Sequence, residues 1–438
     1  MPCIQNNSNE LLIEEIIMLN FRGYIIPIFI IFGIIGSSFV INSFYSMQKL
    51  QPSRFNIYII WITIFQIVDL ITNTFLDDFL GRGLTWASDC KIFIKLDTIS
   101  SFSCKIMNYI PYTAVLISNT LLVIFSIDRL LTTCKPIKFR GDIYLLLPRL
   151  FIIIIICISM LLYLPQLIYS DLTIHDNTSL IGNYTCQYVN SLYFGVQYSL
   201  YLSTIGGYII PTILIAIINI IIILRLRYLI RNRQLLNSKH NSIIHKKISI
   251  DNTTITTTTT NNNSNNNSSN NTLNDRKYSL SNQLIPNPNK QLTNEYHNEM
   301  RRIIGHLMVT SIFLLFSIPL IVIIILRQKS DFHNYHIIYP IYVKRLIHLS
   351  RLFSSLTSII CSFNFFIFLI FLPNFRHMVY LSIFSLPFIK TTKYSIKHIE
   401  QIEIKLSNRL RTRFRRSIES KLLQTTMLQK TRTKSIVN

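Results

Sequence analysis

The residues best suited to chemistry in this 438-residue chain are charged groups placed at the ends of apolar runs. One such group is the pair Asp128-Arg129, which lies at the end of the apolar run 104–130. A charge at the end of a membrane helix is costly unless it faces the helix bundle or the interface. By itself, the pair predicts an ion-pairing or anchoring group at a membrane boundary.

A second charged group lies near the ends of the last two apolar runs. Arg327 follows one run, and Arg351 lies near the start of the next, with His348 one turn away. A guanidinium matches the geometry of a carboxylate, so these residues are candidates for binding an acidic group or the C-terminal carboxylate of a peptide. The alternative is that the long side chains extend toward the membrane interface.

Enzyme and metal chemistry are not indicated. The sequence has no phosphate-binding loop, zinc-binding helix motif or Ser-centred nucleophile elbow. Its seven Cys residues are scattered, without a Cys-x-x-Cys pair or a Cys/His cluster at metal-ligand spacing. We therefore expect no catalytic residue, metal or cofactor.

The composition is that of a membrane protein. Half of the residues are hydrophobic (50%) and only 14% are charged. The net charge of +23 comes from basic residues between and after the apolar runs rather than from one basic module. This placement favours contact with membrane lipids and excludes nucleic acid as the expected partner.

Seven runs are long enough to cross a bilayer, which takes roughly 20 apolar residues per helix. They span approximately 24–47, 57–80, 104–130, 149–169, 198–224, 303–326 and 346–371. The sequence thus predicts an all-α membrane protein, a seven-transmembrane helix bundle.

The distribution of Lys and Arg predicts the orientation of the bundle. The connections after the first, third and fifth runs are basic, whereas 170–201 has no Lys or Arg; 327–345, with four, is the exception. Positive charge stays on the cytoplasmic side, so we expect residues 1–23 outside the cell and the C-terminus inside, in the plasma membrane. Sequons at Asn6, Asn177 and Asn183 would then be glycosylation sites.

Two further segments flank the predicted bundle on its inner side. A Thr-, Asn- and Ser-rich tract at 250–274 predicts a disordered cytoplasmic loop over about 234–298, within a receptor-like unit at 24–380. After the seventh run, alternating apolar and basic residues from Pro373 to Lys390 predict a short amphipathic helix on the membrane face. Residues 381–438 form a basic tail.

Spacings along the chain carry a family resemblance. Cys104 lies 25 residues before Arg129, Ser118 eleven before it and Pro136 seven after it. Proline recurs in the fifth and sixth runs and an Asn-Phe-Phe-Ile-Phe segment lies in the seventh, at Pro211, Pro319 and 364–368. Over roughly 24–380 the chain resembles rhodopsin-like (class A) G-protein-coupled receptors.

The resemblance implies a disulfide and a switch. The resemblance implies that Cys104 is bonded to Cys186. Cys3 and Cys90 are candidates for a second disulfide. The switch residues it implies are Asp128, Arg129, Glu299, Phe313, Pro319, Asn364 and Phe368. Arg129 has two candidate partners, Asp128 and Glu299, and the hypothesis is that it tethers Glu299 at rest, so that removing Glu299 raises basal signalling.

The chain also departs from the family pattern. Two registers compete for the acidic sodium-site position near Ser118: spacing from Asn56 gives Gln66, which we favour, and the Asp-Leu pair gives Asp69. Ser37 replaces the first-run Asn, Asn219 the fifth-run Tyr, and Phe365 and Phe368 the Pro and Tyr of the seventh.

The same comparison narrows the ligand. Pro111 occupies the position where amine receptors carry Asp, and Ser358 the position of the retinal Lys in opsins. The Asn-Phe-Phe form and Asn219 are similar to invertebrate neuropeptide receptors of the FMRFamide-like kind. The resemblance implies an extracellular peptide ligand and a heterotrimeric G protein. The alternatives are a receptor-like protein that does not couple, or a transporter, for which we find no inverted repeat.

Overall fold

The computed structural model describes residues 12–50, 52–92, 94–134, 146–174, 184–188, 198, 201–255, 288–332 and 338–384. For 174, 184, 233–255, 288–298, 331–332, 358 and 384 it describes the backbone only.

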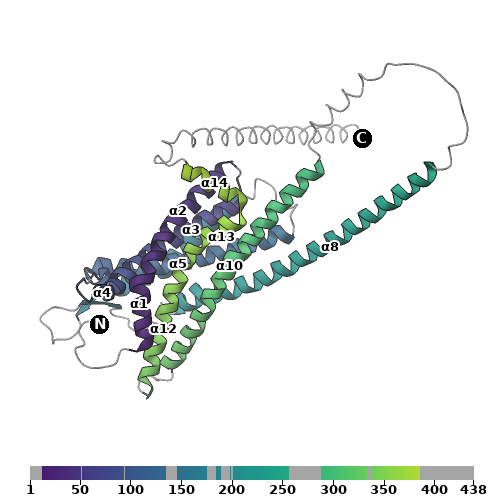
Figure 1. The fold of residues 1–438 in the computed structure, drawn as a ribbon. Helices are drawn as coiled ribbons and strands as arrows, with labels where there is room; N and C mark the ends of the chain where they lie inside the picture. Colours follow the sequence, from purple (N-terminus) through teal and green to yellow (C-terminus); the bar gives the residue numbers. More distant parts are fainter. Residues whose placement is uncertain are drawn as a thin grey trace, which may run out of the picture.

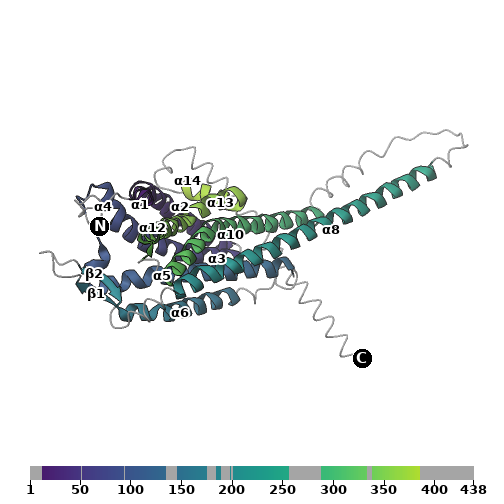
Figure 2. The same cartoon turned by 90° about the horizontal axis from the view of Figure 1, so that it is seen from below.

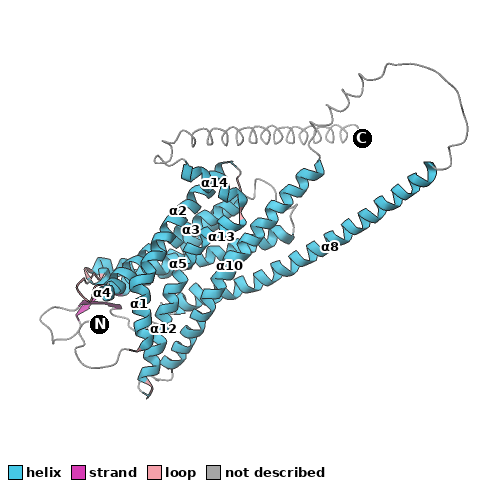
Figure 3. Cartoon of the chain, in the orientation of Figure 1, coloured by secondary structure: helices cyan, strands magenta, loops and turns pink. Residues whose placement is uncertain are grey.

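Seven helices of the described chain are long and apolar enough to cross a membrane, and they pack into one bundle (Figures 1 and 3). They are Ile13–Leu50, Arg54–Ala87, Ser101–Cys134, Leu146–Tyr169, Leu202–Asn232, Glu299–Ser330 and Pro340–Phe371. A short helix, α14 (Pro373–Phe384), follows the seventh span. The predicted fold class is confirmed.

Several spans are composite. The first contains α1 (Ile13–Asn20), the π-helical turn η1 (Phe21–Ile25) and α2 (Ile26–Leu50); the second contains α3 (Arg54–Asp69), the π-helix η2 (Leu70–Gly83) and α4 (Leu84–Ala87). The third and fourth are α5 (Ser101–Cys134) and α6 (Leu146–Tyr169). The fifth combines η5 (Leu202–Ile209) with α8 (Ile210–Ile255), the sixth lies in α10 (Pro288–Phe332), and the seventh joins α12 (Pro340–Ser358) to α13 (Ile360–Phe371). A 3-10 turn, η3 (Leu96–Thr98), precedes α5.

The prediction of a disordered loop over about 234–298 is wrong at both ends. Helix α8 continues to Ile255, and α10 already begins at Pro288, so both helices extend beyond the bundle (Figure 1). Once a helix is nucleated, each further residue adds a backbone hydrogen bond at little cost in conformational entropy. The helices therefore continue past the ends of the apolar runs. The centre of the predicted loop lies outside the described residues, as do the tail residues after 384.

Glycines let the first span approach its neighbours closely. A Cβ atom on Gly83 would lie 2.5 Å from the carbonyl oxygen of Arg22, and one on Gly36 would lie 2.9 Å from the Phe365 side chain. Small residues of this kind allow backbones to pack in direct contact inside a membrane. The first, second and seventh spans therefore form one tightly packed corner of the bundle.

The two ends of the bundle differ, and we name them by their residues. The disulfide end holds Cys104 and an antiparallel hairpin of β1 (Ser170–Ile174) and β2 (Tyr184–Tyr188), seen beside α6 in Figure 2. The Arg129 end holds α14 and an aromatic core. Its rings belong to Phe44, Phe55, Phe125, Phe368 and Phe375, with centroids 5.2 to 5.9 Å apart between neighbours.

Candidate functional site

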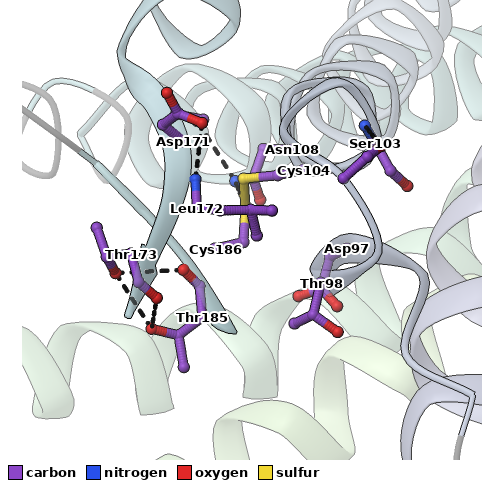
Figure 4. The surroundings of a disulfide bond; sticks show 12 residues. Asp97, Thr98, Ser103, Cys104, Asn108, Asp171, Leu172, Thr173, Thr185 and Cys186 are labelled. Atoms are coloured by element: carbon purple, nitrogen blue, oxygen red, sulfur yellow. Dashed lines mark hydrogen bonds between the residues drawn. A yellow bond between two sulfur atoms is a disulfide. The ribbon is translucent and has the colours of Figure 1, made fainter. Parts of the chain in front are cut away.

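The predicted disulfide is confirmed. Cys104 in α5 is bonded to Cys186 in β2, with a Cα–Cα distance of 5.6 Å (Figure 4). The Asn108 side chain, one turn further along α5, donates to Cys186 Sγ (3.1 Å) and to Ser170 Oγ (3.4 Å). The hairpin is thus fixed to the third span at both of its strands. Cys90 is also disulfide-bonded, whereas Cys3, its candidate partner, lies outside the described residues.

The hairpin is also stabilised internally. The Thr173 and Thr185 hydroxyls lie 3.2 Å apart across the two strands (Figure 4). Hydrogen bonds from the Ser101 side chain and the Leu172 amide lower the pKa of Asp171, which is half-buried at the start of the hairpin. These contacts give Cys186 a fixed position at the rim of the adjacent cavity.

A cavity of about 620 Å³ lies at the disulfide end. Its walls come from η2, the η3 turn with the preceding Lys95, α5, η5, α10 and α12, and Cys186 contributes from the hairpin. Pro111 lines it, so the described wall has no carboxylate at the position where amine receptors carry one. The volume is in the range of small-molecule and cofactor sites.

The charges on the cavity wall fall into two classes. Two cations are paired with acids: Arg82 with Asp77 at 3.5 Å, and Lys95 with Asp97 at 3.2 Å. The predicted ligand residues Arg327 and Arg351 also line the cavity. Among the described residues, neither has an acidic partner.

His348 does not belong to this cavity, contrary to the prediction. Its Nε2 atom lies 3.6 Å from Glu15 Oε2 on α1, and the same carboxylate lies 3.3 Å from Lys344 Nζ. Helix α12 contacts both α1 and α10 (Figure 1), and a step of three residues still turns the side chain by about 60° around the helix axis, so His348 meets α1 while Arg351 lines the cavity. The one-turn spacing between His348 and Arg351 was predicted correctly, but the side of α12 on which His348 lies was not.

At the opposite end, Arg129 is enclosed. Its guanidinium is paired with Asp128 and lies 5.3 Å from the Phe55 ring centroid and 5.6 Å from that of Phe125. Asp128 also pairs with Arg54 of α3 at 2.7 Å. The result is a buried three-residue charge cluster that closes this end of the bundle.

The predicted tether between Arg129 and Glu299 is not formed. Glu299 pairs instead with Arg302 on its own helix at 2.7 Å, and its side chain is 54% exposed. A partner three residues away is within reach whatever the packing of the bundle, whereas Arg129 is already paired and buried. Of the two candidate partners, the structure selects Asp128.

The bundle has seven spans, and a disulfide joins the third span to the hairpin that follows the fourth. An Asp-Arg pair lies at the other end of the third span. The family model of the 7 transmembrane receptor (rhodopsin family) matches residues 85–399, well over half of the chain. The chain belongs to this family. No curated protein matches the chain. Its family and its seven spans make this receptor a multi-pass protein of the plasma membrane.

A polar contact joins the second and seventh spans of the receptor. Asn364 Nδ2 donates to Gln66 Oε1 at 2.9 Å, so Gln66, the residue of the favoured register, contacts the seventh span. Asp69 lies about one turn further toward the disulfide end, and its Oδ1 has no hydrogen-bond partner among the described residues. Ser118 donates to the Val115 carbonyl of its own helix.

The sixth span of the receptor is held by a buried hydrogen bond to the fifth. Asn219 Nδ2 donates to Thr310 Oγ1 at 2.9 Å, and both side chains are buried. On the same helix Phe313 packs in the core and Pro319 interrupts the backbone hydrogen bonding. His306, which the sequence did not single out, is fully buried with its ring 4.5 Å from that of Phe125.

A second buried charge network was missed at the sequence level. Arg22 Nη2 pairs with Asp78 Oδ1 at 2.7 Å, and the two side chains are 2% and 4% exposed. Ser355 Oγ donates to Asp78 Oδ2 at 2.7 Å and accepts from Arg22 Nε and Nη2 at 3.1 Å. Two opposite charges inside apolar spans are a signal for such a pair, because an unpaired charge there is costly.

The proposed glycosylation sites Asn6, Asn177 and Asn183 lie outside the described residues. They remain predictions.

Proposed function

We propose that this receptor binds an extracellular peptide in the cavity at the disulfide end and activates a heterotrimeric G protein at the Arg129 end. The observation that carries the proposal is the contrast between an open, charged cavity at one end and a closed charge cluster at the other. The two are joined by α5 and α10, since α5 lines the cavity and carries Arg129. A ligand that favours one arrangement of these helices would change the opposite end.

The orientation in this proposal rests on two physical arguments. A disulfide forms and persists in an oxidising compartment, which favours an extracellular disulfide end. Basic connections after the first, third and fifth spans favour a cytoplasmic Arg129 end. The N-terminus would therefore be extracellular and the C-terminus cytoplasmic.

The peptide assignment rests on the cavity and on the resemblance to FMRFamide-like receptors. The wall combines charged and amide groups with the aromatic side chains of Tyr112 and Tyr208. Such a surface matches a ligand with both charged or hydrogen-bonding groups and apolar side chains.

The resting state in this proposal is held by buried contacts rather than by Glu299. The Asn219–Thr310 bond ties α8 to α10, and the rings of Phe55 and Phe125 cover Arg129. Activation would break the first contact and expose the guanidinium as α10 swings outward. The swing itself is the motion implied by the family.

The test is G-protein activation in cells that express the receptor, with a peptide library that includes FMRFamide-like sequences. Arg129→Ala should abolish coupling while ligand binding persists. Thr310→Val removes a hydrogen bond of about 1 kcal/mol and should raise basal signalling about fivefold. Thr310→Ser keeps the hydroxyl and is the matched control.

Two results would contradict the proposal. Peptide binding without any G-protein activation would identify a receptor-like protein that does not couple, the alternative favoured by the replaced switch residues Phe365 and Phe368. Basal signalling unchanged by Thr310→Val would show that the α8–α10 contact does not hold the resting state.

A further inference from the structure

The cavity wall carries more positive than negative charge. It contains four cationic side chains and two acidic ones, and each acid is already paired with Arg82 or Lys95. Within the described part of the chain, no acidic side chain pairs with Arg327 on α10 or Arg351 on α12. Two guanidiniums are therefore left to face the cavity.

The surroundings of Arg351 increase this imbalance. Arg82, Arg22 and Arg327 all lie close enough to repel its charge, and Asp77 is the acid that partly offsets them. Arg22 is already neutralised by Asp78, and Arg82 by Asp77. Like charges in a partly desolvated cavity repel more strongly than in water, so an anion placed between them gains correspondingly.

A hydrogen bond from the first span also holds the backbone of Arg351 in position. Its backbone carbonyl accepts a hydrogen bond from Arg22 Nη2 at 3.3 Å, and Ser355, one turn along α12, belongs to the same buried network. The network holds this part of α12 against the first and second spans. A guanidinium presented from a fixed helix is preorganised for binding.

We propose that Arg327 and Arg351 together bind a carboxylate of the ligand, and that this carboxylate links α10 to α12. The proposal deepens the proposed function and rests on it for the ligand's access to the cavity. A planar carboxylate matches the fork of donors on each guanidinium. Because the Arg22 network fixes α12, binding draws the disulfide end of α10 toward it.

A carboxylate can come from a free C-terminus or from an acidic side chain. Three peptide pools of equal length separate these sources. The first has free C-terminal acids and no Asp or Glu, the second has C-terminal amides with Asp or Glu, and the third has C-terminal amides with neither. The FMRFamide-like resemblance by itself would favour amidated peptides, so the third pool is the critical comparison.

The readout is direct binding to the purified full-length receptor, measured as thermal stabilisation by each pool. We expect stabilisation by the first or second pool and none by the third; which of the two acts identifies the source. Arg327→Gln and Arg351→Gln should each weaken that binding about ten- to hundredfold, as expected for loss of a charge-assisted hydrogen bond. Arg345→Gln is the matched control, because Arg345 lies outside the cavity lining and pairs with Glu14 at 3.4 Å.

Stabilisation by the third pool equal to that by the others would overturn the proposal. So would binding that is unchanged in both Gln variants, or no binding from any pool. G-protein activation is measured separately. Carboxylate binding without activation leaves the carboxylate site standing and contradicts the coupling function, whereas activation by the third pool contradicts the carboxylate site alone.

Discussion

The disulfide end and the Arg129 end of the bundle are built from the same helices but packed by different physical means. At the disulfide end, polar and charged side chains surround a cavity, and a buried ion pair with the Ser355 hydroxyl joins three spans. At the Arg129 end, aromatic rings fill the interior and one charge cluster closes it. The first arrangement leaves room for a ligand, and the second leaves none for a partner until the helices move.

The contacts that hold the helices together also differ in strength between two parts of the bundle. Arg22, Asp78 and Ser355 satisfy one another and fix the first, second and seventh spans at the disulfide end. The contact between the fifth and sixth spans is weaker, since a neutral hydrogen-bonded pair, Asn219 with Thr310, holds it. The spans expected to move therefore have the contact that is easier to break.

The largest expected effect comes from breaking the buried pair at the disulfide end. Arg22→Ala leaves Asp78 buried without its partner, a change that typically costs about 3–5 kcal/mol. We expect a large fall in the melting temperature of the purified receptor and low surface expression. Arg22→Leu with Asp78→Leu removes both charges and should recover much of the stability.

Arg345→Ala is the matched control for that comparison. It removes a solvent-accessible pair between the exposed Arg345 and the half-buried Glu14, worth about 0–1 kcal/mol. Equal losses for Arg22→Ala and Arg345→Ala would show that burial does not distinguish the two pairs.

The next effect concerns the hairpin at the rim of the cavity. Cys104→Ser breaks the link between α5 and β2, and loss of a native disulfide costs about 2–5 kcal/mol in small secreted domains. We expect reduced surface expression and weaker ligand binding, measured on intact cells. Cys157→Ser, at an exposed free cysteine, should change neither; a comparable loss there would point to a general sensitivity to cysteine replacement.

The smallest effect is expected at Glu299. Because Glu299 pairs with Arg302 on the exposed surface of α10, Glu299→Ala should change stability by about 0–1 kcal/mol and leave basal signalling unaltered. The comparison is with Thr310→Val in the same assay. A rise as large as that of Thr310→Val would restore the tether to Arg129 that the sequence suggested.

The sequence by itself determined the seven spans, because a helix satisfies its backbone polar groups within one segment and a membrane requires that segment to be apolar. It also determined the Cys104–Cys186 link through the family spacing. It misjudged where helices end beyond the apolar runs, as in α8, since apolar length says nothing of a helix that continues outside the bundle.

The partners of charged side chains were decided by the tertiary structure alone. Arg22 and Ser355 are 333 residues apart in the chain and meet across the first and seventh spans, while Gly83 lets the second span approach the backbone of Arg22 closely. Arg129 selected Asp128 over Glu299, and His348 faced α1 rather than the cavity. The rotation of each helix about its axis sets these choices. That rotation depends on side-chain packing between segments far apart in sequence, which no local pattern records.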